Sequence, residues 1–185
     1  MKSLIVAMTG ATGAIYGIRL LQVLRENSVE VHLVISPWAE KVISLETDQS
    51  PEEIRKLAGK CYPADDLSAP ISSGSFPVDG MVIIPCSMKT LAAIAHGMST
   101  NLIVRAADVM LKEKKRLILV PRETPFNLIH LRNMTSAAEA GAIILPPMAA
   151  FYFHPKTIAD LVDHLVGKVL DLLGVDHQLF PRWGQ

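Results

Sequence analysis

Three polar loops, each directly following an apolar run with the character of a buried β-strand, constrain the fold of this chain most strongly. They are Gly10-Ala11-Thr12-Gly13, Pro85-Cys86-Ser87-Met88-Lys89-Thr90 and Pro121-Arg122-Glu123-Thr124-Pro125. In an open α/β sheet the ligand crevice lies beyond the carboxyl ends of the strands, so loops that follow separate strands converge on one ligand. The sequence therefore predicts a single functional edge built from these three loops.

The order of the apolar segments predicts an α/β fold. A strand at 3–8, a helix at 14–25 and a strand at 29–35 form a β-α-β unit, in which parallel strands are joined by a right-handed crossover. Further strands are predicted near 61–62 and at 81–84, 116–120 and 142–145, with helices at 37–45, from Ser50-Pro51 onward, and at 89–95, 101–113, 130–140 and 157–173. Residues 64–79 are expected to form a loop over the sheet. Residues 1–185 are thus interpreted as a single-domain, three-layer, Rossmann-like parallel sheet.

The composition indicates a chain whose surface is partly covered by other subunits. Half of the 185 residues are hydrophobic, only 19% are charged, and the 18 basic and 18 acidic residues cancel. A chain without net charge has no overall field to hold nucleic acid or an anionic membrane surface. The mean hydropathy of +0.31 predicts a homo-oligomer, with the C-terminal helix and tail, about residues 150–185, contributing to the contacts. On that helix Ile158, Leu161, Val162, Leu165 and Val169 recur and are expected to be buried.

The cysteines and the N-terminus indicate a cytoplasmic protein. Cys61 and Cys86 have neither the spacing of a disulfide framework nor that of a zinc site. The apolar run from Leu4 to Met8 is too short for a signal sequence, and no stretch reaches the roughly 18 apolar residues of a membrane span.

The first loop favours a mononucleotide phosphate or a ribityl chain over a dinucleotide. Its glycines, with Gly17, match neither G-x-G-x-x-G nor the P-loop pattern, and the second strand ends at Ser36-Pro37 rather than at an acidic residue. A packing role, in which Gly10 and Gly13 only let helix and strand approach closely, explains this loop equally well.

The second and third loops carry the other candidate binding groups. Ser87, Lys89 and Thr90 stand at the start of a predicted helix, where hydroxyls, a cation and the helix dipole together bind anions. The alternative is an ordinary N-cap by Ser87 with a solvated lysine. Arg122 can fork onto phosphate or a flavin carbonyl, and Glu123 can move a proton if burial raises its affinity for one; a surface ion pair is the alternative.

Two further features exclude other chemistry. Cys86 has no neighbouring base and is interpreted as a packed residue rather than a nucleophile. The six histidines show no paired metal-binding spacing, so no metal is predicted.

Seven segments, in order along the whole chain, carry a resemblance to a known family. They are MTGATGAIYG, SGSF at 73–76, PCSMKTLA at 85–92, RAADVMLKE at 105–113, PRETP at 121–125, ILPPMAAFY at 144–152 and the terminal PRWG. Together they resemble the UbiX-type flavin prenyltransferases, which include proteins long named as components of phenolic acid decarboxylase. The resemblance implies a flavoprotein-type fold and a homododecamer.

The resemblance also implies an activity and a set of site residues. Family members transfer a dimethylallyl group from dimethylallyl monophosphate to N5 and C6 of reduced FMN, without a metal, and the prenylated FMN serves a UbiD-type decarboxylase. By position, FMN would be held by Gly10, Ala11, Thr12, Ser36, Ser87, Met88, Lys89, Thr90 and Arg122. The prenyl phosphate would be held by Tyr152 and Lys168, with Arg105 and Lys112 nearby and Trp183 closing the site. Glu123, Glu46 and Thr12 would be the catalytic residues.

Two positions depart from many relatives, and two other activities remain open. Thr12 stands where many relatives have Ser, and Lys168 where many have Arg, which alone can form a bidentate fork. An FMN-dependent oxidative decarboxylase of cysteine-containing substrates shares this fold, although such enzymes resemble one another in an Asn of the second loop that is absent here. A non-catalytic, flavin-carrying subunit of a decarboxylase would have the same binding residues.

Overall fold

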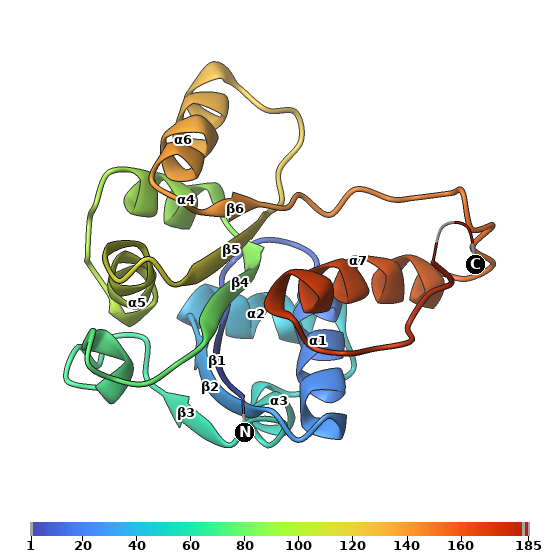
Figure 1. Cartoon of the computed structure of the whole chain (residues 1–185), viewed down its shortest axis with the longest axis horizontal. Coiled ribbons are helices and arrows are strands. Elements are labelled where there is room, and N and C mark those ends of the chain that lie inside the picture. The colour runs from blue at the N-terminus through green and yellow to red at the C-terminus, as the bar shows by residue number, and fades with distance from the viewer. Residues whose placement is uncertain (1, 183, 185) are drawn as a thin grey trace.

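The computed structural model describes residues 2–182 and 184, and at its centre lies a six-stranded parallel sheet (Figure 1). The strands are β1 (Ser3–Met8), β2 (Glu30–Ile35), β3 (Lys60–Tyr62), β4 (Gly80–Cys86), β5 (Arg116–Pro121) and β6 (Ile143–Ile144), in the spatial order β3-β2-β1-β4-β5-β6. The strand order reverses between β1 and β4, which is where open α/β sheets bind their ligands. The predicted fold class is confirmed.

Seven α-helices and one 3-10 turn accompany the described strands. They are α1 (Ala14–Glu26), α2 (Pro37–Glu46), α3 (Pro51–Arg55), η1 (Pro70–Ser72), α4 (Met88–Ala95), α5 (Leu102–Lys112), α6 (Leu128–Glu139) and α7 (Ile158–Leu173). Serine, asparagine or threonine caps six of the seven α-helices, since side chains at 36, 50, 87, 101, 127 and 157 each accept a first-turn amide. None of the helices in this described part of the chain combines the length and the apolar character that a bilayer crossing needs.

The sheet separates two hydrophobic layers. Side chains of a strand alternate between its two faces, so Leu4 and Val6 pack with α1, α2 and α7, whereas Ile5 and Ala7 pack with α4 and α5. Figure 1 shows the same division, with α1 and α7 on one side of the strands and α4, α5 and α6 on the other. A residue on α5 and a residue on α7 are therefore separated by the sheet.

The structure adjusts several predicted boundaries. β4 continues through Pro85 and Cys86, with a register shift against β5 after Ile83, so the second loop begins inside a strand. Residues 64–79 do cover the sheet, and Ile71 and Val78 are buried there beside α5. β6 is shorter than predicted.

The first turn of α7 is not covered within one chain. Val162, Leu165 and Val169 are buried and Leu161 is half-buried, but Ile158 is 73% exposed. Ile158 lies in the first turn of α7. There α7 and the preceding chain project beyond the sheet (Figure 1), so no layer of the same chain covers Ile158.

Candidate functional site

Hydrogen bonds join the ends of four neighbouring strands into one continuous edge. The amide of Ser36, after β2, donates to the last carbonyl of β1 over 3.0 Å. The amide of Ser87, after β4, donates to Oγ1 of Thr9 over 2.7 Å, and Arg122, after β5, donates its amide to the last carbonyl of β4 over 3.2 Å. The three loops picked out from the sequence therefore meet at one edge.

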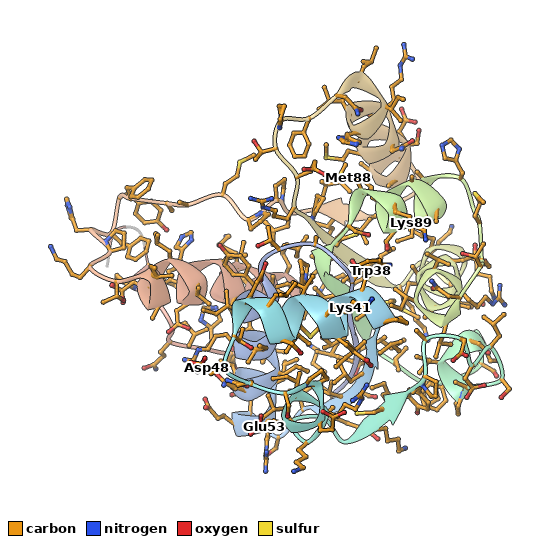
Figure 2. The ribbon with its side chains drawn as sticks, turned by 180° about the vertical axis from the view of Figure 1, so that it is seen from behind. Trp38, Lys41, Asp48, Glu53, Met88 and Lys89 are labelled. Carbon is orange, nitrogen blue, oxygen red and sulfur yellow. The ribbon has the colours of Figure 1, made fainter. Side chains whose placement is uncertain are left out.

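Two helices begin at this edge, and each is capped by a serine that was predicted to bind FMN. Oγ of Ser36 accepts the amide of Ala39 over 3.1 Å at the start of α2, and Oγ of Ser87 accepts the amide of Thr90 over 3.3 Å at the start of α4. In Figure 2 the N-terminal part of α2, with Trp38, lies toward α4, with Met88 and Lys89. A hydroxyl that accepts a helix amide keeps its own proton, so the capping role and a binding role are compatible.

The first loop owes its glycines to backbone geometry and close packing. Gly13 has a φ of 104°, in the left-handed region, and a Cβ at Gly10 would lie 2.5 Å from Cβ of Trp38. The packing role considered for these glycines is therefore present in the fold. It brings the backbone of Gly10 against the start of α2, at the edge where the residues predicted to bind FMN gather.

Glu46 lies beside the first loop, as its predicted role requires. Its Oε2 accepts the amides of Gly13 over 2.8 Å and Ala14 over 3.0 Å, so a carboxylate from the end of α2 caps the start of α1. Thr12 directly precedes Gly13 in this loop. The amides at the start of α1, which bind phosphate in dinucleotide-binding folds, are thus occupied by the protein itself.

The third loop presents both of its charged residues to solvent. Arg122 and Glu123 are exposed, and Oε1 of Glu123 accepts the amide of Thr124 over 3.0 Å. The burial that was expected to assist Glu123 is not provided by this single chain. A ligand on the edge or a second subunit would have to supply it.

Tyr152, in the chain before α7, contacts His164 on α7, the helix that carries Lys168. Oη of Tyr152 lies 2.9 Å from Nε2 of His164, which is one helical turn before Lys168. Nζ of Lys168 is 4.0 Å from Oδ2 of Asp171, and the guanidinium of Arg182 binds both oxygens of that carboxylate at 3.1 and 2.8 Å. Arg182 holds the pKa of the Asp171 carboxyl below its usual value. Because the Asp171 carboxylate is engaged by Arg182, the ammonium group of Lys168, whose side chain is 48% exposed, remains accessible to an anion.

Arg105 and Lys112 do not join the other predicted residues within one chain. Both lie on α5, across the sheet from α7. Arg105 donates Nε to the carbonyl of Ser72 over 3.1 Å, and Lys112 pairs with Glu113. Lys112 ends α5 shortly before β5 begins, so it lies near the amino edge of the sheet, opposite the three loops. Trp183 lies outside the described residues.

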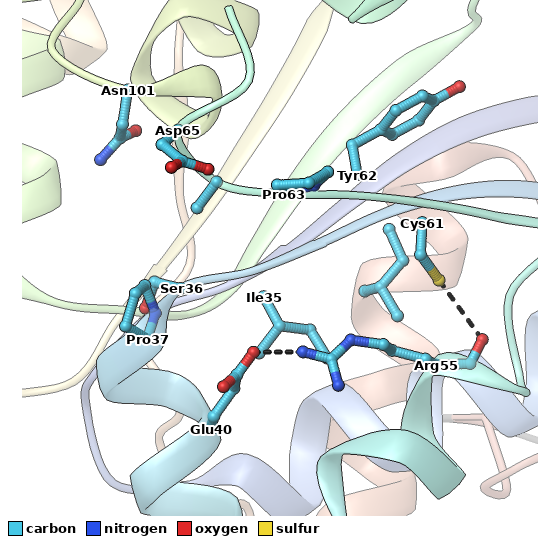
Figure 3. A pocket seen from close by; sticks show the side chains of 12 residues that line it. Ile35, Ser36, Pro37, Glu40, Arg55, Cys61, Tyr62, Pro63, Asp65 and Asn101 are labelled. Atoms are coloured by element: carbon cyan, nitrogen blue, oxygen red, sulfur yellow. Dashed lines mark hydrogen bonds and ion pairs between the residues drawn. The ribbon is translucent and has the colours of Figure 1, made fainter.

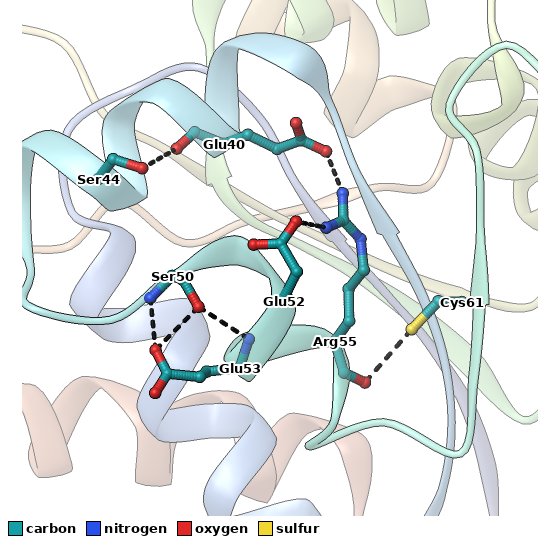
Figure 4. A network of polar contacts seen from close by, with 7 residues as sticks. All are labelled: Glu40, Ser44, Ser50, Glu52, Glu53, Arg55 and Cys61. Atoms are coloured by element: carbon teal, nitrogen blue, oxygen red, sulfur yellow. Dashed lines mark hydrogen bonds and ion pairs between the residues drawn. The ribbon is translucent and has the colours of Figure 1, made fainter.

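A groove of about 630 Å³ adjoins this edge at Ser36 (Figure 3). It runs from Ser36 along α2 to the end of β3, and Asp65 and Asn101 lie on its rim. These two residues were not among the predicted site residues; the predicted start of a helix at 101 was the available signal. Arg55 lines this groove and forms ion pairs with Glu40 and with Glu52 (Figure 4).

Cys86 is a packed residue, as predicted. Its side chain is fully buried, and burial raises the pKa of the thiol to about 12. Among residues 2–182 and 184, no three His, Cys, Asp or Glu side chains gather where they could hold a metal ion.

The chain is similar to a known class of proteins and, more closely, to one family within it. Residues 1–170 match the family model described as Flavoprotein. The chain is 55% identical over 182 residues to flavin prenyltransferase PAD1 of Saccharomyces cerevisiae, covering 98% of this chain and 75% of that protein. The chain belongs to the UbiX-type flavin prenyltransferases.

Two solved structures are closely similar. The complex of AnUbiX (PadA1) with FMN and dimethylallyl pyrophosphate has a TM-score of 0.98 and 54% identity, over 100% of this chain and 98% of that one. A dodecameric FMN-dependent Ubix-like decarboxylase from Escherichia coli O157:H7 has a TM-score of 0.96 and 52% identity, over 99% and 100%. The peptidyl-cysteine decarboxylase EpiD, at 17% identity and a TM-score of 0.65 over 94% and 99%, shares the fold alone.

Proposed function

We propose that this chain transfers the dimethylallyl group of dimethylallyl monophosphate, the prenyl donor, to reduced FMN. The product, prenylated FMN, would then serve as the cofactor of a UbiD-type decarboxylase. The observation that carries the proposal is the hydrogen-bonded edge formed by the ends of β2, β1, β4 and β5. It gathers hydroxyls and cations at the switch point of a fold whose family makes this product.

The donor set at this edge suits FMN. Hydroxyls of Ser36, Ser87 and Thr90 match a ribityl chain and a phosphate, and Lys89 adds a cation at the start of α4. Because Glu46 occupies the amides at the start of α1, we assign the phosphate to the starts of α2 and α4. Gly10, Ala11, Thr12, Met88 and Arg122 complete the proposed cradle.

When bound, reduced FMN supplies the two nucleophilic positions, N5 and C6. The remaining work falls to the protein: Tyr152 and Lys168 bind the leaving phosphate, and Lys112 and Arg105 add positive charge from another chain. Glu123, together with Glu46 beside Thr12, accepts the proton that C6 must lose. Trp183 is proposed to close the site over the allylic group, which an aromatic face stabilises as it becomes cationic.

Assembly follows from the apolar surface that one chain leaves exposed. Met148, Phe151 and Ile158 are each more than two-thirds exposed on the projecting chain and the start of α7, and Leu128 and Ile129 are exposed on α6. We propose that copies of this chain cover these residues in a homododecamer, with residues 150–185 making contacts. The compartment we assign is the reducing cytoplasm, in keeping with the free thiols of Cys61 and Cys86.

The test is the mass of flavin extracted after anaerobic incubation of the protein with reduced FMN and dimethylallyl monophosphate. We expect the mass to increase by one C5H8 unit, and the Lys168→Ala variant, matched for FMN content, to convert far less. A parallel incubation with dimethylallyl pyrophosphate decides between the two prenyl donors. Unmodified flavin with both donors would contradict the proposal and favour a flavin-carrying subunit, whereas oxidative decarboxylation of a cysteine-terminated peptide would favour the other activity.

A further inference from the structure

His164 is enclosed by aromatic rings from both ends of α7. It is 9% exposed, and its ring stacks on Phe153 with centroids 5.1 Å apart and planes at 9°. The ring of Phe180, from the chain after the helix, has its centroid 4.7 Å from the centroid of the imidazole. Its polar contact is Oη of Tyr152, at 2.9 Å from Nε2. The imidazole is thus a fixed neighbour of a tyrosine proposed to bind the prenyl phosphate.

The surroundings favour the neutral imidazole. Burial lowers the pKa of His164, and the positive charge of Lys168, one turn further along α7, lowers it further. A neutral imidazole carries one N–H donor and one acceptor nitrogen, so Nε2 either donates to the tyrosine oxygen or accepts its proton. These two arrangements have opposite consequences for Tyr152.

A tyrosine hydroxyl has a single proton to donate. If Nε2 accepted that proton, Tyr152 would turn lone pairs toward an incoming phosphate, and two acceptors repel each other. If Nε2 carries the imidazole proton and donates it, the hydroxyl proton of Tyr152 is kept for a phosphate oxygen. Charge-assisted hydrogen bonds of this kind are among the stronger ones in proteins.

We infer that His164 is a positioning residue for the prenyl donor: its Nε2–H donates to Oη of Tyr152 and so directs the tyrosine proton to the donor phosphate. This inference rests on the proposed function. It assigns to a buried histidine a part in binding the phosphate together with Lys168.

The test is a double-mutant cycle on binding of dimethylallyl monophosphate to the full-length, FMN-loaded protein, measured by calorimetry. His164→Phe keeps an aromatic ring between Phe153 and Phe180 but removes both nitrogens. We expect it to weaken binding about tenfold, as for the loss of one hydrogen bond to a charged group, while FMN affinity stays unchanged. His164→Gln, whose amide can donate from a similar position, is expected to restore part of the loss. In a Tyr152→Phe background, His164→Phe is expected to cause no further loss.

Three outcomes would overturn the inference. The first is wild-type affinity for the prenyl donor in His164→Phe. The second is additive losses of affinity in the Tyr152→Phe, His164→Phe double variant. The third is an equal loss of affinity in His164→Phe and His164→Gln. Thermal unfolding and sedimentation identify variants that fail to fold or assemble, and His164→Leu replaces the Phe variant if that one fails. Absence of prenyl-donor binding by the wild-type protein would instead overturn the proposed function, and this inference with it.

Discussion

At the scale of single residues, the groups proposed to take part in the reaction are exposed in the single chain. Glu123 is exposed on a loop fixed between Pro121 and Pro125, and the amide of Thr124 donates to its carboxylate. Such a side chain has one backbone contact and is otherwise accessible. Its contribution should therefore appear in the reaction rather than in binding or folding.

We predict that Glu123→Gln binds FMN as the wild type does but forms prenylated flavin about a hundredfold more slowly. The reason is that an amide preserves size and hydrogen bonding but cannot accept a proton, and general bases contribute about 10²- to 10⁴-fold to rates. FMN binding is followed by fluorescence quenching and product by mass spectrometry. Glu139→Gln, an exposed change on α6, serves as the control. Unchanged product formation would remove Glu123 from the proposed mechanism.

At the scale of elements, Glu46 links α2 to α1. One carboxylate oxygen accepts two amides at the start of α1, where Gly13 offers no side-chain cap. The same carboxylate is proposed to act in proton transfer beside Thr12. Two variants separate the structural role from the chemical one.

We predict that Glu46→Ala lowers the free energy of unfolding by about 1 kcal/mol, the usual cost of losing a helix cap. Glu46→Gln keeps an oxygen acceptor and should lose much less stability, but it should form product as slowly as the alanine variant. Urea unfolding and product mass are measured on the same preparations. If Glu46→Gln were as active as the wild type, Glu46 would be a cap and nothing more.

The pairing of β2 with β3 and the 64–79 loop depends on a buried neutral histidine. His32 is 1% exposed, contacts the hydroxyl of Tyr62 at 3.0 Å, and meets the ring of Phe76 edge-on at 5.1 Å. Burial lowers the pKa of His32 below its ordinary value of 6.5. On acidification the unfolded chain therefore binds a proton that the folded chain rejects.

We predict that stability falls as the pH drops below about 6.5 and that His32→Phe flattens this dependence on the acid side of that pH. Tyr62→Phe, which keeps the imidazole, should lose some stability but retain the slope. Urea midpoints across this range provide the measurement. A full slope in His32→Phe would assign the effect to other groups.

The sequence was sufficient for features that depend on local pattern. Apolar runs and capping residues such as Ser50 and Ser87 indicated the strands, the helices and the edge where the loops meet. It was not sufficient where contacts join distant segments, as between Glu46 and Gly13 or between His164 and Tyr152. It also could not indicate that Ile158 lies beyond the covered part of α7, because helical periodicity continues whether or not a partner layer is present.

At the scale of the whole molecule, the sheet divides the proposed residues for the prenyl phosphate. Tyr152 and Lys168 lie with α7 on one face, while Arg105 and Lys112 lie on α5 on the other. The 11 residues of α5 span about 16 Å, at about 1.5 Å per residue. Lys112 is the last residue of α5, at the end of the helix that is farther from the three loops. A site that uses all four residues must therefore take them from different copies of the chain.

Complementation between two variants tests this account most directly. Lys112→Ala and Lys168→Ala are each expected to form little prenylated flavin when they assemble alone. In an assembly that contains both chains at random, about a quarter of the sites receive both intact lysines from different copies, so about a quarter of the wild-type activity should return. Product is measured by mass spectrometry on co-expressed, co-purified chains. We expect activity to recover in the mixed assemblies, and mixed assemblies as inactive as the separate variants would show that the four residues do not form one shared site.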